Sequence, residues 1–351
     1  MNRREWMGTM MLLATSIESK AADLFGKSDN LSANKEKETE QDAGLLPNKE
    51  KKHPANNAAY LKEVRKLHIK VGARKPFSAL HIADSHLTRV DARENERKHA
   101  LSASRVQHFL QGEAYFSAAL RYARQNNLLL LHSGDVIDFV SEANLDYVAE
   151  QLLTVKAFVS AGNHEYSQYV GEAKEDEAYK AQSYARVQEA YPNDLRMASQ
   201  VVHGVNFISL DDVYYHVTKE QYQWMKKQVE RGLPIVLVCH VPFYTEKHCQ
   251  QNLRENNGLA AYMTGVPEDI TKTFQANPSL PEEEQWRNRS VQQKADIPTL
   301  EFIAWLKQQP LLKAILAGHC HAFYEERFSP TAVQYTVGAG YEGAAYEIEF
   351  E

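Results

Sequence analysis

Short apolar runs alternate with amphipathic stretches along most of this chain. The runs rich in Leu, Ile, Val and Phe have the length of strands, and they predict β-strands over residues 77–83, 128–132, 156–160, 201–210, 234–239 and 312–317. Between them, apolar residues recur three or four positions apart, which predicts helices over residues 102–124, 176–191, 219–231 and 298–308. Thr218 and Gln221 form a capping-box pattern at the start of the third helix. This alternation is typical of a layered α/β domain.

The ends of the chain depart from that alternation. After residue 322 the pattern shortens into strands and turns, and residues 346–350 alternate as in a strand at the edge of a sheet. Residues 27–59 carry mixed charges, no aromatic residue and few large apolar residues, which predicts a disordered linker. We therefore expect one folded domain over residues 60–351.

The first 26 residues resemble a twin-arginine export signal. Arg3 and Arg4 precede Trp6 and a weakly apolar run over residues 7–17, which is too short to cross a bilayer because a spanning helix takes about 20 residues. We expect a periplasmic or extracellular protein with no integral membrane segment in its mature chain. The alternative is a frayed amphipathic N-terminus on a cytoplasmic protein.

Composition excludes some classes of partner and site. The formal net charge of -6 leaves no basic field for a nucleic-acid backbone, so no nucleic-acid partner is expected. Cys239, Cys249 and Cys320 are odd in number and have no CxxC spacing, which indicates neither a disulfide framework nor a cysteine-rich zinc site.

Polar motifs follow five of the predicted strands. They are Asp84-Ser85-His86, GDVID over residues 134–138, GNHE over residues 162–165, His240, and GHCH over residues 318–321. Because α/β sheets bind ligands at the carboxyl ends of their strands, we expect these five loops to converge on one crevice. Any one motif alone is more often a polar turn. Together they supply imidazole, carboxylate and amide groups, which suit zinc, iron or manganese.

These motifs resemble those of the calcineurin-like metallophosphoesterases, from about residue 77 to the C-terminus. The resemblance implies an α/β fold, a four-layer αββα sandwich of two mixed β-sheets with flanking helices. It also implies a hydrolase of phosphomonoesters or phosphodiesters, with a small-molecule or lipid substrate. GDVID lacks the Arg that follows the second Asp in Ser/Thr protein phosphatases, and it has Asp138 where purple acid phosphatases carry a Tyr ligand. We therefore expect a compact single-domain member outside those two groups, of open oligomeric state.

The resemblance also implies a role for each motif residue. Asp135 would bridge two divalent or trivalent metal ions, Mn, Fe or Zn. The remaining implied ligands are Asp84, His86 and His321 at one ion and Asn163, His240 and His319 at the other. His164 would be catalytic, as general acid or phosphate contact, with a structural histidine as the alternative. Asp138 would be a catalytic carboxylate that orients His164 or a ligand, whereas Glu165 would only satisfy backbone groups.

Phosphoester chemistry accounts for these residue types. Two metal ions roughly 3.5 to 4 Å apart would lower the pKa of a shared water, so that a bridging hydroxide could attack phosphorus without a covalent phosphoenzyme. The alternative is an inactive metal-binding scaffold that serves as a binding module. A scaffold that had lost its activity would be expected to lack one of the implied ligands or His164, and all of these residues are present.

Residues 244–296 form a long connection that we interpret as a substrate-side insertion, either a functional lid or a disordered segment. Its large apolar residues would line a pocket for an organic leaving group or would pin the insertion to the body of the domain: Tyr244, Tyr262, Met263, Phe274 and Trp286. Nearer the first motif, Arg89, Arg93 or Arg97 could reach a phosphate, although such a run is more often a solvated helix start.

Cys320 lies between two of the implied ligands. In an extended backbone, residues two apart share a face, so we expect His319 and His321 both to face the crevice. Cys320 would then point away into packing and would not bind metal.

Overall fold

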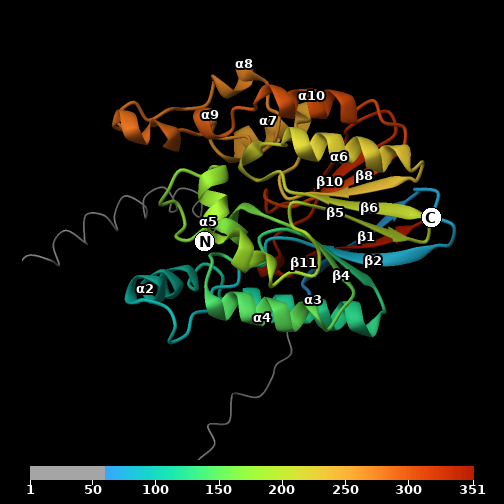
Figure 1. The fold of residues 1–351 in the computed structure, drawn as a ribbon, viewed down its shortest axis with the longest axis horizontal. Coiled ribbons are helices and arrows are strands. Elements are labelled where there is room, and N and C mark those ends of the chain that lie inside the picture. Colours follow the sequence, from blue (N-terminus) through green and yellow to red (C-terminus); the bar gives the residue numbers. More distant parts are fainter. Residues whose placement is uncertain (1–59) are drawn as a thin grey trace, which may run out of the picture. The chain divides into compact units, whose positions relative to one another are not determined.

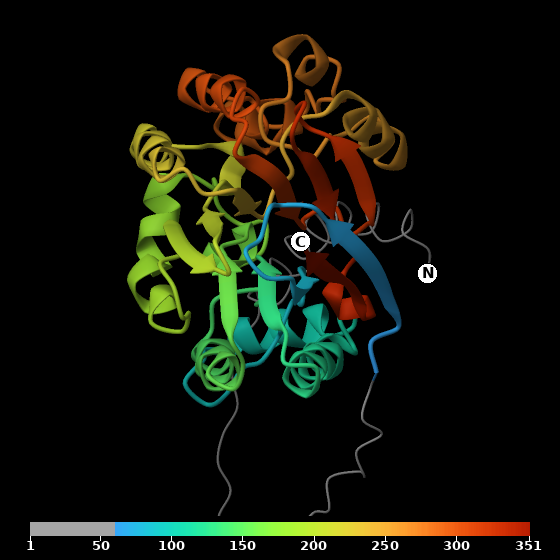
Figure 2. The ribbon, with the colours of Figure 1, turned by 90° about the vertical axis from the view of Figure 1, so that its right-hand side faces the viewer.

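Two β-sheets pack face to face between two layers of helices in the part of the chain that the structure describes (Figures 1 and 2). The structure is a computed structural model and describes residues 60–351, so the interpretations of residues 1–26 and 27–59 lie outside the described residues. Both sheets are mixed, which confirms the predicted four-layer αββα sandwich.

The first sheet has the strand order β1-β11-β2-β3-β4. The strands are β1 Glu63–Ile69, β2 Phe77–Ile82, β3 Leu129–Ser133, β4 Ala157–Ser160 and β11 Ala344–Phe350. Strand β11 runs antiparallel to β2, and all other neighbours are parallel. Strands β2, β3 and β4 therefore end at the same edge of the sheet.

The second sheet has the strand order β5-β6-β7-β8-β10-β9. The strands are β5 Met197–Val202, β6 Val205–Leu210, β7 Ile235–Val238, β8 Leu312–Ala317, β9 Tyr324–Arg327 and β10 Val333–Thr336. The outer pairs β5-β6 and β9-β10 are antiparallel and the central neighbours are parallel. Strands β7 and β8 thus also end together.

Helices cover the outer face of each sheet (Figure 1). The α-helices are α2 Glu96–Arg105, α3 Gly112–Gln125, α4 Glu142–Leu152, α5 Glu177–Gln188, α6 Lys219–Glu230, α7 Glu246–Glu255, α8 Glu268–Thr271, α9 Arg289–Gln292 and α10 Ile297–Leu306. Short 3₁₀ helices are η1 Asn163–Tyr166, η2 Val213–Tyr215, η3 Glu282–Arg287 and η4 Gly340–Glu342. Apolar residues of α3, α4 and α5 pack on the first sheet, and those of α6 and α10 pack on the second.

The core between the sheets holds the two strand edges in a fixed relation. Leu131 and Ile348 from the first sheet and Phe207 and Val236 from the second are fully buried in it. Burying one such side chain is worth roughly 1.5 to 3 kcal/mol, so this interface stabilises the relative position of β3 and β7.

The prediction of one strand over residues 201–210 is wrong. Residues 197–210 form the hairpin β5-β6, whose turn residues His203 and Gly204 have left-handed φ of 47° and 86°. Two consecutive left-handed residues are the geometry of a two-residue hairpin turn, which the apolar character of the flanking residues concealed. Similarly, the helix predicted over residues 102–124 is two helices, α2 and α3, separated by residues 106–111.

The edge position predicted for residues 346–350 is also wrong. Strand β11 lies between β1 and β2, so β1 is the edge. Strand β1 reads EVRKLHI and is mostly exposed, and charged residues of this kind are typical of edge strands but give little strand signal. Helix α4, which begins at an N-cap Ser141, was not predicted either.

The insertion at residues 244–296 contains α7, α8, η3 and α9, so the alternative of a disordered segment is wrong. Met263 and Phe274 form a small apolar cluster with Cys249, and Tyr244 packs against it. Every member of this cluster belongs to the insertion, so these side chains pack the insertion on itself, whereas Tyr262 lies outside that cluster and contacts His319.

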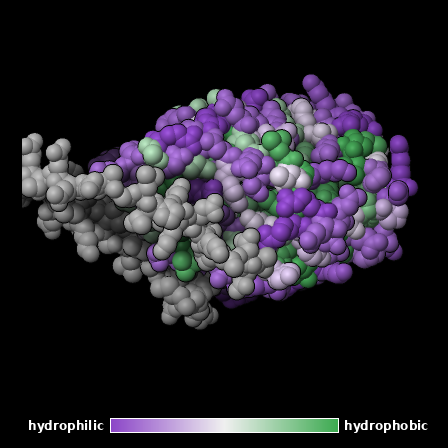
Figure 3. All heavy atoms as spheres, turned by 90° about the horizontal axis from the view of Figure 1, so that it is seen from below, coloured by the Kyte–Doolittle hydropathy of each residue, from purple (hydrophilic) through white to green (hydrophobic). Residues whose placement is uncertain are grey.

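Two further details of the described chain follow from its sequence. The capping box at Thr218 and Gln221 is confirmed at the start of α6. Figure 3 views the layer of α3 and α4 from outside. Most of this face is hydrophilic, with smaller apolar areas between the polar residues, as on a solvated helix face. Within residues 60–351, every helix is too short or too polar to cross a membrane.

Candidate metal centre

The five polar motifs lie in loops that follow the carboxyl ends of strands from both sheets. Strands β2, β3 and β4 lead into the loops of Asp84, Asp135 and Asn163, while β7 and β8 lead into those of His240 and His319. The structure brings these loops together at one end of the sandwich, as the sequence predicts.

Three groups of three side chains at these loops could each hold a metal ion, with candidate ligand atoms within 4.8 Å of one another. Two of them share no residue and match the implied ligand sets: Asp84, His86, His321 and Asp135, His240, His319. The third joins His86 and Asp135 with His164, so its geometry also admits His164 as a ligand. Asp135 Oδ2 lies 3.2 Å from His240 Nε2 and 3.7 Å from His86 Nε2. One carboxylate therefore faces both implied ligand sets, which is the position that a bridging ligand requires.

Two buried polar atoms beside these groups have no hydrogen-bond partner within the described chain: His86 Nε2 and Asn163 Oδ1. Leaving a polar atom buried and unpaired costs roughly 1 to 3 kcal/mol, so each needs a partner. An imidazole nitrogen and an amide oxygen, next to carboxylates and further imidazoles, form a donor set that fits zinc, iron or manganese. The residues present thus fit the metal ions that the resemblance implies.

Hydrogen bonds from the far side of the rings orient the candidate ligands. His240 Nδ1 donates to the carbonyl oxygen of Ser133 at 2.7 Å, which leaves Nε2 directed at Asp135. His86 Nδ1 donates to Asp138 Oδ1 at 3.0 Å, and the ring of Phe109 stacks on His86 at 4.5 Å between centroids. Such contacts fix the tautomer and raise the basicity of a ligating histidine.

Asp138 connects the candidate ligand His86 to His164. Its Oδ1 lies 3.2 Å from His164 Nδ1, and its carbonyl oxygen lies 2.6 Å from the same nitrogen. Because a carbonyl only accepts, Nδ1 carries a hydrogen and Nε2 is the ring atom available to a substrate. Burial lowers the pKa of His164, but Asp135 and Asp138 together raise it to about 9. The structure thus places Asp138 between His86 and His164, in contact with both rings.

Arg105 is a functional candidate that the sequence does not reveal. From the end of α2, its Nε and Nη2 donate to Asp138 at 2.6 and 2.7 Å, and both side chains are buried. Burial alone would raise the pKa of Asp138, but Arg105 first, then His164 and His86, hold it well below its ordinary value. An arginine at the end of an amphipathic helix gives no sequence signal that distinguishes this contact from a solvated one.

Glu165 holds the loop backbones, as predicted. Its carboxylate accepts hydrogen bonds from the backbone N–H groups of Gly162, Asp135 and Val136 at 2.6 to 2.8 Å. Gly162 is needed here because a Cβ at that position would lie 2.2 Å from Asp135 Oδ1. The Glu165 carboxylate and the absence of a side chain at Gly162 thus allow the GNHE and GDVID loops to pack closely against each other.

Backbone strain concentrates at the candidate ligands. Of the eleven non-glycine residues with positive φ in the described part of the chain, five are candidate ligands, with values from 47° to 65°: Asp84, His86, Asp135, His319 and His321. A residue with a side chain reaches this region at a cost of about 1 kcal/mol or more, and such strain clusters at functional sites.

The same strain corrects one expectation. Residues 319–321 are not extended, because His319 and His321 both have left-handed backbones. Both imidazoles nevertheless reach the site, with His321 Nε2 at 3.3 Å from Asp84 Oδ1. Cys320 is buried, and its Sγ lies 3.6 Å from the carbonyl oxygen of Tyr262. All three cysteines are buried free thiols, and none of the candidate metal-holding groups of the described chain includes Cys320.

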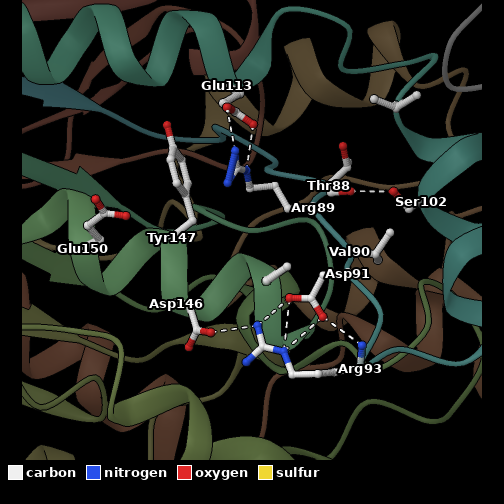
Figure 4. A pocket seen from close by; sticks show the side chains of 12 residues that line it. Thr88, Arg89, Val90, Asp91, Arg93, Ser102, Glu113, Asp146, Tyr147 and Glu150 are labelled. Carbon is white, nitrogen blue, oxygen red and sulfur yellow. Dashed lines mark hydrogen bonds and ion pairs between the residues drawn. The ribbon is translucent and has the colours of Figure 1, made fainter. Parts of the chain in front are cut away.

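The arginines after the first motif are held in ion pairs. Arg89 pairs with Glu113 and lies over the ring of Tyr147, and Arg93 pairs with Asp91 and Asp146 (Figure 4). These residues line a surface cavity of about 630 Å³. Arg97 likewise pairs with Glu172. Their contacts favour the structural alternative over a phosphate contact.

Comparison with known proteins gives the class. The profile of the calcineurin-like phosphoesterases matches residues 77–323, and this chain belongs to that family. Among curated protein sequences, none matches it. A dimetal phosphatase from Danio rerio aligns with 77% of this chain and 91% of its own, at 13% identity and a TM-score of 0.40.

Other solved structures are similarly distant. A 5'-nucleotidase from Candida albicans aligns with 81% of this chain at 12% identity and a TM-score of 0.37, and the match spans 48% of the nucleotidase. A phosphopantetheinyl hydrolase from Mycobacterium tuberculosis aligns with 76% of this chain and 90% of its own, at 12% identity and a TM-score of 0.36. The chain thus spans about half the length of the nucleotidase.

Proposed function

We propose that this protein hydrolyses phosphomonoesters or phosphodiesters with a dinuclear metal site. The observation that carries the proposal is Asp135, whose Oδ2 faces His240 of one ligand group and His86 of the other. Bound there, two ions of manganese, iron or zinc would supply a hydroxide nucleophile at neutral pH and would neutralise charge on the phosphoryl oxygens.

Residues of the chain itself would handle the leaving group. His164 holds a proton on its ring, and Asp138 fixes that ring through Nδ1, so Nε2 can donate to the departing oxygen. Arg105 in turn fixes Asp138 through two hydrogen bonds. Asp84, Asp135 and Asp138 are buried, which strengthens their electrostatic contacts with the neighbouring histidines.

The test measures metal content and turnover in the same preparation. We expect about two transition-metal ions per chain and, with manganese, zinc or iron present, hydrolysis of an aryl phosphomonoester, a bis-aryl phosphodiester or both. The ratio of the two rates assigns the substrate class. Bound metal without hydrolysis of either would favour the non-catalytic scaffold, and neither metal nor hydrolysis would refute the proposal.

A further inference from the structure

An arginine of the insertion stands beside the candidate metal centre. Arg289 begins α9 and is half-buried, with its guanidinium carbon 5.5 Å from the ring centroid of Tyr262. That ring in turn packs edge-on against His319, 5.6 Å between centroids. A single tyrosine ring therefore separates Arg289 from a candidate metal ligand.

The segment that carries Arg289 is fastened to the metal centre by polar contacts. Gln293 accepts hydrogen bonds from the backbone N–H groups of Ala261 and Tyr262 at 3.2 and 3.0 Å. Its Nε2 lies 3.5 Å from the hydroxyl of Tyr215, which lies 3.2 Å from His319 Nε2. The insertion is thus held in a defined position against His319.

Backbone strain extends from the ligands to these two tyrosines. Tyr215 and Tyr262 have φ of 67° and 53°, in the same left-handed region as the candidate ligands. A tyrosine is rare in this region, and strain of this kind persists where the surroundings hold it for function. Both strained tyrosines contact the candidate ligand His319.

Charge distinguishes Arg289 from the other arginines near the site. Arg89, Arg93 and Arg97 form ion pairs with carboxylates, and Arg105 is bound to Asp138. Within residues 60–351, no carboxylate lies within ion-pair distance of Arg289, whose side chain instead hydrogen-bonds Gln292.

Glu175 lies within electrostatic reach of both Arg289 and His164. Burial raises the pKa of the Glu175 carboxyl, and Arg289 followed by His164 opposes that shift. Both cations therefore act on one half-buried carboxylate, which lies near enough to respond to Asp135 as well.

We propose that Arg289 binds the phosphoryl oxygens of the substrate, so that the insertion at residues 244–296 completes the anion-binding part of the active site. The inference rests on the proposed function, because the anion it requires is a phosphoester held at the metal centre. A guanidinium offers two parallel N–H donors that match two phosphoryl oxygens. Tyr262 and Gln292 hold that fork in place.

The experiment compares Arg289→Gln with Arg289→Lys and a control in the same segment. Arg287→Gln removes the same charge two residues away, from a side chain that faces Glu284 and Trp286. Inorganic phosphate is titrated into each metal-loaded protein by calorimetry, and KM and kcat are measured with the aryl phosphoester that the wild type hydrolyses. Metal content and the thermal midpoint are recorded for every variant.

We expect Arg289→Gln to weaken phosphate binding and raise KM by about 10- to 100-fold, the range for losing hydrogen bonds to a charged group, with metal content unchanged. Arg289→Lys should lose less, because it keeps the charge without the fork. Arg287→Gln should match the wild type.

Phosphate affinity and KM within twofold of wild type in both Arg289 variants would overturn the inference while leaving the proposed function intact. A wild type that binds metal and phosphate but hydrolyses no phosphoester would instead refute the proposed function. If Arg289→Gln fails to fold, Arg289→Lys decides by the same criterion.

Discussion

The Arg105–Asp138 pair makes the sharpest test of how this site is built. Both side chains are buried, and two hydrogen bonds of 2.6 and 2.7 Å join them. Replacing Arg105 with Met keeps most of the volume but leaves the Asp138 carboxylate buried beside two histidines. Removing one partner of a buried pair costs roughly 3 to 5 kcal/mol, and we take the lower end because His86 and His164 keep their contacts with Asp138.

The assay is chemical and thermal unfolding in the presence of a chelator, so that metal loss does not contribute to the difference. We expect Arg105→Met to lower the free energy of unfolding by about 3 kcal/mol or more. The thermal midpoint should fall by about 2 to 4 °C for each kcal/mol lost.

Two comparisons isolate the pair. Asp138→Asn should also destabilise, but the double variant should lose less than the sum of the single variants, by roughly 0.5 to 3 kcal/mol of coupling. Arg89→Met removes an exposed arginine from its pair with Glu113 and should cost under about 1 kcal/mol. An Arg105→Met protein no less stable than Arg89→Met would refute the reasoning.

Three further predictions concern the candidate metal centre. Asp135→Ala should lose at least one metal ion, measured by elemental analysis, and nearly all activity. His164→Ala should keep its metal ions, and its rate should fall most with substrates that have poor leaving groups; loss of metal in this variant would make His164 a ligand. Gly162→Ala should also lose metal, because its Cβ would lie 2.2 Å from Asp135 Oδ1, and an unchanged metal content would show that the loop yields. Cys320→Ser should retain full metal occupancy, and loss of either ion would contradict the buried, packed thiol.

The sequence was most informative where a polar motif directly follows a buried strand. Asp84, Asp135 and Asn163 follow buried strands directly, and strands of one parallel sheet must end side by side, so their meeting could be predicted. Arg105 and Arg289 could not be predicted. Arg105 contacts Asp138 from the end of α2, and Arg289 lies beside Tyr262 from the start of α9. Only tertiary packing decides which arginine turns inward.

The errors in the fold have a similar origin. Strand β1 is an exposed, charged edge, and its existence depends on pairing with β11 from the opposite end of the chain. The left-handed backbones of His319 and His321 also escape any argument from periodicity, since histidine is enriched in that region but still adopts it only rarely.

Those strained backbones imply that the folded domain would be more stable without its candidate ligands. Five candidate ligands occupy a conformation that glycine adopts freely, at about 1 kcal/mol each, or about 5 kcal/mol in all. That sum is comparable with the whole net stability of a typical domain. Glycine at these positions would relax the loops and remove the candidate ligands together, so stability and metal binding would make opposite demands on the same five positions.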